Sequence, residues 1–255
     1  MTDVLKALSS TPWLSLLDAS AQAALAQSAR LVSFRPGRRV VRCGEAVREI
    51  LFVVSGTVRL GAPVLERGAT LVALRGAGAV LGASEVLANE LPKSDAVTLE
   101  AVTLVGIPND VFIRLIENER RFALEVCRQL ALLAQNLQEQ AGLLAPLPVA
   151  IRLRQLLLRY AATCGTVLED GVQLRPKLTQ ASLAMDLGVE RKSVLRGMDQ
   201  LREAGLLDKR NARYHLPSPQ ALESWSPNDL MPMSASLRRS EEDLLAEPEE
   251  SLSNA

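Results

Sequence analysis

The sequence is poor in the residues that most enzyme sites need. It has one histidine, His215, which removes most metalloenzyme sites and Ser-His-Asp catalysis. Its three cysteines, Cys43, Cys127 and Cys164, stand far apart without a C-x-x-C pair, and this argues against a disulfide scaffold, a zinc ribbon or a dithiol redox site. We find no nucleophile–base pair and no metal cluster in the pattern, so we expect a protein that is not an enzyme and has no cofactor.

Long hydrophobic runs and a secretion signal are also missing. No apolar run reaches roughly 18 residues, the length that a membrane helix requires. The first ten residues lack a basic start followed by an apolar stretch. With 255 residues, 48% of them hydrophobic, the chain can bury the core of one large or two modest domains. We expect a cytoplasmic protein that does not associate with membranes.

Aromatic residues make up only 3% of the chain, so Leu, Val and Ala must build most of the core. The net charge of zero hides an uneven distribution. Residues 151–216 carry 12 basic and 7 acidic side chains, whereas residues 217–255 carry 2 and 8. A basic segment followed by an acidic tail cancels in the sum, but a nearby polyanion would attract the basic segment.

Between residues 31 and 107, short apolar runs alternate with glycine-containing turns. This pattern predicts many short strands and hence an all-β roll or barrel. A helix is expected before it, from Pro12 to Ala29. The predicted strands are 40–41, 50–54, 58–60, 71–74 and 97–105.

After the strands the apolar period changes to about 3.5, which predicts one helix from Asn109 to Leu144. The heptad positions favour a parallel coiled coil between two copies of the chain, and an amphipathic helix lying on its own domain is the alternative. Gly142, Pro146 and Pro148 would end the helix and form a hinge. The expected interface residues are Val126, Leu130, Leu133 and Leu137.

The sharpest local pattern lies at residues 178–207 and is typical of a helix-turn-helix. Thr179 can cap a first helix, and Gly188 can take the left-handed turn that follows it. A second helix opening at Glu190 or Arg191 would project cations from its first two turns, where such helices reach base edges. A strand pair around Asn211 supplies a wing.

Several motifs together resemble the cyclic-AMP receptor protein and fumarate–nitrate regulator (Crp/Fnr) superfamily of bacterial transcription factors. They are F-x-P-G at 34–37, Gly44-Glu45, LFVV-x-G-x-V at 51–58 and Gly78-x-x-x-Gly82, in addition to the helix-turn-helix. The resemblance implies an α+β protein with a cyclic-nucleotide-binding-like jelly roll (1–108), a dimerisation helix (109–145), a winged helix-turn-helix (146–216) and a disordered acidic tail (217–255).

The resemblance also implies which residues meet DNA. The family's recognition helix reads Arg-Glu-Thr-Val-x-Arg, and this chain has Arg191 and Arg196 at the two arginine positions but Lys192 in place of the glutamate. A lysine cannot accept from a cytosine amino group, so we expect a half-site that differs from the family's common one. The expected DNA contacts are Thr179, Gln180, Arg191, Lys192, Ser193 and Arg196.

The effector cassette of the family is altered in this chain. Ala83 stands where the family has the glutamate that binds ribose, and Lys93 stands where it has the arginine that binds phosphate. The family's adenine-contacting pair on the dimer helix corresponds to Leu137 and Gln138. These three departures argue against cyclic AMP. The candidate effector residues are Gly82, Ala83, Ser84, Glu85, Lys93, Ser94, Leu137 and Gln138.

Three functional interpretations follow from these patterns. The leading one is a homodimeric regulator that binds promoter DNA, contacts RNA polymerase, and has a degenerate or reassigned effector pocket. The first alternative is a regulator that responds to cyclic AMP or a related nucleotide. The second is an interaction protein that keeps the fold but does not bind an operator, for which the acidic tail would be a partner surface.

Overall fold

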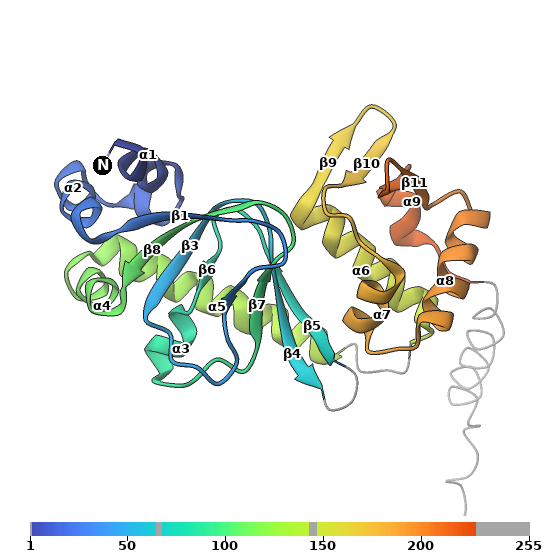
Figure 1. Cartoon of the computed structure of the whole chain (residues 1–255), viewed down its shortest axis with the longest axis horizontal. Helices are drawn as coiled ribbons and strands as arrows, with labels where there is room; N and C mark the ends of the chain where they lie inside the picture. Colours follow the sequence, from blue (N-terminus) through green and yellow to red (C-terminus); the bar gives the residue numbers. More distant parts are fainter. Residues whose placement is uncertain (1, 65–67, 143–146, 228–255) are drawn as a thin grey trace, which may run out of the picture. The chain divides into compact units, whose positions relative to one another are not determined.

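The computed structural model describes residues 2–64, 68–142 and 147–227 (Figure 1). All of the sites discussed below lie in one compact unit, Met1–Glu223. The chain begins with helix α1 (Thr2–Ser10), a 3-10 turn η1 (Leu14–Leu16) and helix α2 (Ala19–Ser28). The prediction of one helix over 12–29 was wrong because Asp18 caps a new helix by accepting from the Ala21 backbone N–H at 2.7 Å.

The strands between residues 30 and 108 form two four-stranded antiparallel sheets, with orders β1-β8-β3-β6 and β2-β7-β4-β5, which confirms the predicted β-rich domain. The predicted single strand 97–105 is divided, because residues 99–101 turn the chain from one sheet into the other. The elements are β1 (Arg30–Phe34), β2 (Arg39–Val41), β3 (Glu49–Ser55), β4 (Val58–Val64), β5 (Gly68–Arg75), β6 (Val80–Leu81), α3 (Ala83–Ala88), β7 (Asp95–Thr98) and β8 (Val102–Pro108).

The turn between β3 and β4 explains one position of the glycine framework. Gly56 has φ +83°, and a Cβ atom there would lie 2.3 Å from the Ala101 carbonyl oxygen. Only glycine fits this conformation and this close approach. The turn therefore depends on Gly56 for both reasons.

Four of the few aromatic side chains gather in the core of the N-terminal domain, which contains the two sheets and is called the sensor domain below. Trp13 packs edge-on against Phe52 and Phe122, with ring centroids 6.0 and 6.4 Å apart. Phe112 contacts Phe122 with centroids 5.8 Å apart. These rings join the N-terminal segment, the first sheet and the helices that follow the sheets into one core.

The predicted helix 109–144 is two helices, α4 (Asn109–Asn118) and α5 (Arg120–Gly142). The break falls at Glu119, whose backbone leaves the helical region (φ −109°, ψ 88°). Phe112 of α4 is fully buried in the sensor core, so α4 belongs to the sensor domain. The predicted boundary at residue 108 therefore lies one helix too early.

The C-terminal domain is a winged helix-turn-helix, as predicted, with a sheet of order β11-β12-β10-β9. The hairpin β9–β10 was not predicted. Helix α9 was not predicted either: it begins the segment that was expected to be disordered, and its Leu222 is fully buried. The rest of that predicted tail, 228–255, lies outside the described residues. The elements are α6 (Val149–Cys164), β9 (Gly165–Leu168), β10 (Gly171–Leu174), α7 (Gln180–Leu187), α8 (Arg191–Glu203), β11 (Asp208–Arg210), β12 (Arg213–Leu216) and α9 (Pro219–Ser224).

Candidate DNA-reading helix and effector pocket

The helix-turn-helix is fixed by local hydrogen bonds that the sequence predicts. Thr179 caps α7 by accepting from the Ser182 backbone N–H at 3.0 Å, and the Ser182 hydroxyl accepts from the Thr179 N–H at 2.9 Å. Gly188 ends the helix in the left-handed conformation, with φ +64°. The cap at Thr179 and the left-handed turn at Gly188 set the angle at which α8 leaves the turn.

The two sides of α8 differ sharply. Val194 and Met198 are fully buried, whereas Arg191, Lys192 and Arg196 are exposed. Their outward placement on the first two turns is the one that the sequence predicts for a helix that reads the major groove. Ser193 is half-buried and belongs to the same turn.

Arg191 is oriented by hydrogen bonds to the neighbouring helix. Its Nη2 and Nε donate to Gln180 Oε1 at 2.8 and 3.2 Å. Gln180 is the first residue of α7, so this bond joins the N-terminal ends of the two helices. It restricts a long flexible side chain, so less conformational entropy is lost when that side chain binds a further acceptor.

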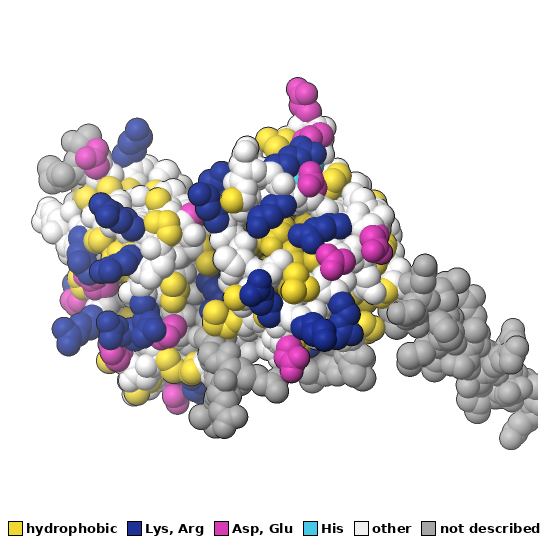
Figure 2. All heavy atoms as spheres, turned by 45° about the vertical axis from the view of Figure 1, so that its right-hand side comes forward, with side chains coloured by type: hydrophobic (Ala, Val, Ile, Leu, Met, Phe, Trp, Pro, Cys, Tyr) yellow, Lys and Arg dark blue, Asp and Glu magenta, His cyan; other side chains and the backbone are white. Residues whose placement is uncertain are grey.

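The wing adds further cations. Asn211 and Ala212 both have positive φ, as a two-residue hairpin turn between β11 and β12 requires. Lys209 lies 5.6 Å from the centre of the Tyr214 ring. Figure 2 shows Lys and Arg side chains at many places on the visible surface, separated by polar and hydrophobic side chains.

A cavity of about 220 Å³ lies in the sensor domain between the second sheet, α3 and α5. Its walls combine apolar side chains, such as Trp13 and Leu60, with a few polar ones. Among the predicted effector residues it is lined by Gly82, Ala83, Ser84, Glu85 and Ser94. Five of the eight predicted effector residues therefore lie at one cavity.

Of the other three predicted effector residues, only Lys93 has a described side chain. Lys93 is exposed and is not part of the lining. Helix α5 meets the cavity at Gln129 and Leu130. The predicted Leu137 and Gln138 follow eight positions later, about 12 Å along a helix, and their side chains lie outside the described residues.

Sequence reasoning also missed Arg75, which lines the cavity from the end of β5. The only signal was a basic residue that ends an apolar strand directly before Gly76. Burial lowers the pKa of the Arg75 guanidinium, and the positive charge of Arg159 lowers it further. Arg75 is therefore a cation in an environment that disfavours its charge.

The predicted dimer interface needs one correction. Val126 is 3% exposed and packs in the core of its own sensor domain. Two leucines of α5 are exposed, Leu124 at 60% and the predicted Leu130 at 36%. Leu130 lines the cavity, and the side chains of Leu133 and Leu137 lie outside the described part of the chain.

An ion pair joins the sensor domain to the helix-turn-helix. Arg59 of β4 donates from Nε to Asp186 Oδ1 of α7 at 2.6 Å, and the side chains are 13% and 1% exposed. The Tyr160 hydroxyl of α6 donates to the other carboxylate oxygen at 2.7 Å. Burial raises the pKa of the Tyr160 phenol well above its ordinary value, and the Asp186 charge adds to this effect.

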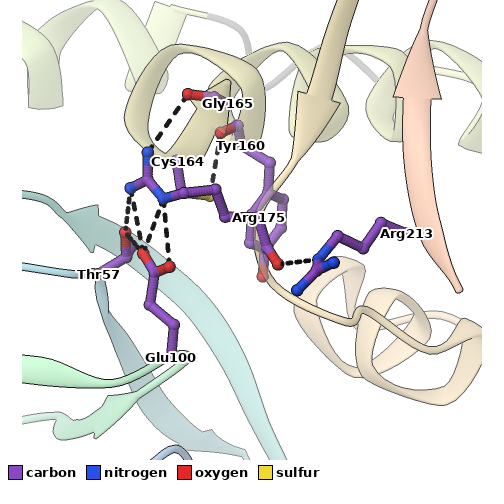
Figure 3. Close-up of polar contacts among 7 residues, drawn as sticks. All are labelled: Thr57, Glu100, Tyr160, Cys164, Gly165, Arg175 and Arg213. Atoms are coloured by element: carbon purple, nitrogen blue, oxygen red, sulfur yellow. Dashed lines mark hydrogen bonds and ion pairs between the residues drawn. The ribbon is translucent and has the colours of Figure 1, made fainter. Parts of the chain in front are cut away.

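A second polar cluster joins the same two domains (Figure 3). The Arg175 guanidinium lies 3.1 Å from Glu100 Oε1, which also accepts from the Thr57 hydroxyl at 2.7 Å. The hydrogen bond to Glu100 raises the pKa of Arg175. Arg175 in turn accepts from Arg213 Nε through its carbonyl at 2.8 Å, so β12 is tied to the same residue.

Two kinds of site are not found among the described residues. No group of three or more His, Cys, Asp or Glu side chains there could hold a metal ion. No helix in the described ranges is both long and apolar enough to cross a membrane.

The fold and these two sites define a class: a sensor domain with a small-molecule cavity, connected by a long helix to a winged helix-turn-helix. The family model of the cyclic nucleotide-binding domain matches residues 31–119, and that of the Crp-like helix-turn-helix domain matches residues 151–225. Together they span well over half of the chain. The chain belongs to the Crp/Fnr superfamily of transcription regulators.

Solved structures share this fold at low sequence identity. A CooA variant from Carboxydothermus hydrogenoformans is 19% identical with a TM-score of 0.61, over 79% of this chain and 88% of that one. The c-di-GMP-responsive regulator CLP from Xanthomonas campestris is 20% identical with a TM-score of 0.65, over 79% and 100%. FixK2 from Bradyrhizobium japonicum is 17% identical with a TM-score of 0.65, over 78% and 98%. No curated protein sequence matches the chain.

Proposed function

We propose that this chain is a homodimeric, sequence-specific DNA-binding regulator whose sensor cavity takes a ligand other than cyclic AMP. The proposal depends on one observation: α8 has a buried apolar side and an exposed cationic side. Val194 and Met198 are buried, and Arg191, Lys192 and Arg196 are exposed. A helix whose apolar side packs on its own domain, and whose N-terminal turns carry positive charge, can enter a major groove. The proposed partners are double-stranded promoter DNA and RNA polymerase.

The proposed dimer forms through α5. Leu124, Cys127, Arg128 and Ala131 are exposed and share one face at spacings of three and four residues. Pairing this face with that of a second copy would cover Leu124. Two copies would present two recognition helices to half-sites about 34 Å apart, so the operator is expected to be two-fold symmetric.

Footprinting of the purified protein on sheared genomic DNA tests the DNA-binding part. We expect a two-fold symmetric site and an affinity that falls steeply as salt rises, because phosphate contacts release counterions. Arg191→Ala should cost about 1–3 kcal/mol at one base position if this side chain reads a base edge. Arg114→Ala, which removes an exposed cation of α4, is the control and should leave the footprint unchanged.

Two results would contradict the proposal. One is the absence of a salt-dependent footprint on any DNA fragment, which would favour an interaction protein that keeps only the fold. The other is an equal loss with Arg191→Ala and with Arg114→Ala, which would mean that α8 does not lie on the DNA.

A cyclic nucleotide is the second candidate effector, because the cyclic nucleotide-binding family model matches the sensor domain. The geometry gives it less support. Ala83 stands at the ribose position of the family pattern, and Lys93 is absent from the cavity lining. Calorimetric titration with cyclic AMP and cyclic GMP separates the two candidates: micromolar binding would favour the nucleotide, and no heat would favour another ligand.

A further inference from the structure

We propose that the sensor cavity binds a compact, partly apolar organic carboxylate and that Arg75 holds its carboxylate group. This inference deepens the proposed function, since it names the ligand class of the same cavity. Arg75 reaches the cavity from the last position of β5. Its antiparallel partner across the hairpin is Val58, so the side chain leaves the sheet on the same face as Leu60, another lining residue.

The guanidinium has room for an anion. Its one polar contact among the described residues is a 3.5 Å approach of Nη1 to the Leu74 carbonyl oxygen, which is long for a hydrogen bond. No described carboxylate lies within 4 Å of it. Glu85 also lines the cavity, but its carboxylate already accepts from the Ser84 hydroxyl at 2.8 Å.

The surroundings of Arg75 favour a negative charge. Burial lowers the pKa of the guanidinium, the nearby Arg159 lowers it further, and the attraction of Glu85 is the smallest of the three effects. A half-buried cation with a like charge as neighbour gains from an incoming anion more than an exposed one does. The planar guanidinium can grip a carboxylate at two points.

The lining and the volume of the cavity determine which ligand body can accompany the carboxylate group. Trp13, Leu60, Leu81 and Leu130 give the cavity an apolar lining, and Ser94 adds a hydroxyl. The volume of about 220 Å³ is below the range of roughly 300–1,000 Å³ typical of drug-sized ligand sites. An apolar body with one anionic end fits this lining, and a nucleotide is larger and more polar than it favours.

The two tryptophans provide a direct readout. Trp13 lines the cavity, so replacing Trp225 with Phe leaves a single reporter at the site. The full-length Trp225→Phe protein would be titrated with acetate, benzoate and phenylacetate, each beside its neutral amide. Inorganic phosphate would be a further probe. We expect benzoate or phenylacetate to change Trp13 fluorescence and raise the melting temperature, while the amides do neither.

Variants assign the effect to the side chain. Arg75→Gln should weaken carboxylate binding about tenfold or more, the loss expected for a charge-assisted hydrogen bond, and Arg75→Lys should retain part of it. Lys93→Gln, an exposed cation close to the cavity in sequence, is the matched control and should bind as the parent does. Circular dichroism and the melting temperature without ligand would confirm that each variant is folded.

Equal binding of benzoate and benzamide, equal binding by the parent and Arg75→Gln, or no response to any carboxylate would overturn the inference. Binding of phosphate alone would overturn the apolar part of it. Operator binding by the unliganded parent and Arg75→Gln is measured separately. Loss of DNA binding in both would therefore count against the proposed function, and not against the ligand class.

Discussion

At the scale of single residues, Lys192 is the position of α8 where the family pattern has a glutamate. Its ammonium group can donate to guanine acceptors or to phosphate, but it cannot accept from cytosine. We predict that Lys192→Glu shifts the half-site preference toward cytosine at one position, with a change of about 1–3 kcal/mol there. Binding to a set of operators with single-base changes would measure it.

The same set of operators distinguishes the alternative role. If Lys192 contacts only phosphate, Lys192→Glu should weaken binding to all sequences alike and reduce the salt dependence. Lys192→Ala is the control, since it removes the donor without adding an acceptor. A cytosine preference that appears with alanine as well would contradict the base-reading role.

Cys164 gives a pH prediction. Burial raises the pKa of its thiol from 9.0 to about 12 in the folded protein. Between these pH values the unfolded chain has lost the thiol proton and the folded chain has kept it. Unfolding therefore becomes easier as pH rises, by up to about 1.4 kcal/mol per pH unit.

Cys164→Ser should flatten this decline, because a serine hydroxyl does not ionise in this range and can still donate to the Tyr160 carbonyl oxygen as the thiol does. Urea unfolding at pH 8 and pH 10.5 would show it. Cys43→Ser, at a half-buried position away from the proposed dimer face, should follow the parent. An identical alkaline decline in all three proteins would refute the role of Cys164.

Residue-level prediction from the sequence succeeded where the signal is local. The Thr179 cap, the Gly188 turn and the outward cations of α8 depend on spacing within one segment, and each is found where expected. Arg75 and Gln129 could not be found in this way. Their place in the cavity depends on how β5 and α5 pack against the rest of the sensor domain, and spacing along the chain does not reveal that packing.

At the scale of elements, α5 shows the limit of pattern reasoning. A heptad pattern marks apolar positions but cannot say whether they face their own domain or a partner, since both surroundings are apolar. Val126 faces the core of its own domain, whereas Leu124, on a different face of α5, is exposed. The helix break at Glu119 carried no proline or glycine signal, and the capping side chain of Asp18 lay inside an otherwise continuous helical pattern.

Leu124→Glu should therefore shift the dimer toward the monomer and weaken operator binding, because it places a charge on the proposed interface. Sedimentation analysis would report the first effect and a mobility shift the second. Leu16→Glu, at another exposed leucine, is the control and should change neither. A Leu124→Glu protein that remains a dimer would place the interface elsewhere.

At the scale of the whole molecule, the contact between the sensor and the helix-turn-helix depends on a buried charge pair. Removing either Arg59 or Asp186 alone leaves the other charge poorly compensated, which typically costs about 3–5 kcal/mol. We predict that Arg59→Ala and Asp186→Ala are each strongly destabilising. The double variant should lose less than their sum, with a coupling of about 1–3 kcal/mol.

Urea unfolding of the four proteins in this cycle measures the coupling. The exposed pair of Arg114 and Asp110, four residues apart on α4, is the matched control and should show far weaker coupling. Additive losses at Arg59 and Asp186 would mean that the two side chains stabilise their own domains separately. The sequence could not have predicted this pair, whose partners are 127 positions apart.

The hairpin β4–β5 has two faces with different tasks. Arg59 and Leu60 are consecutive, so their side chains leave the strand on opposite sides: Arg59 reaches Asp186, and Leu60 lines the cavity. The hairpin therefore separates the cavity from the contact with the helix-turn-helix. A substitution in this hairpin that reshapes the cavity is therefore expected to disturb the contact with the helix-turn-helix as well. In variants of this hairpin, altered ligand preference and altered promoter response are expected to arise as one trait.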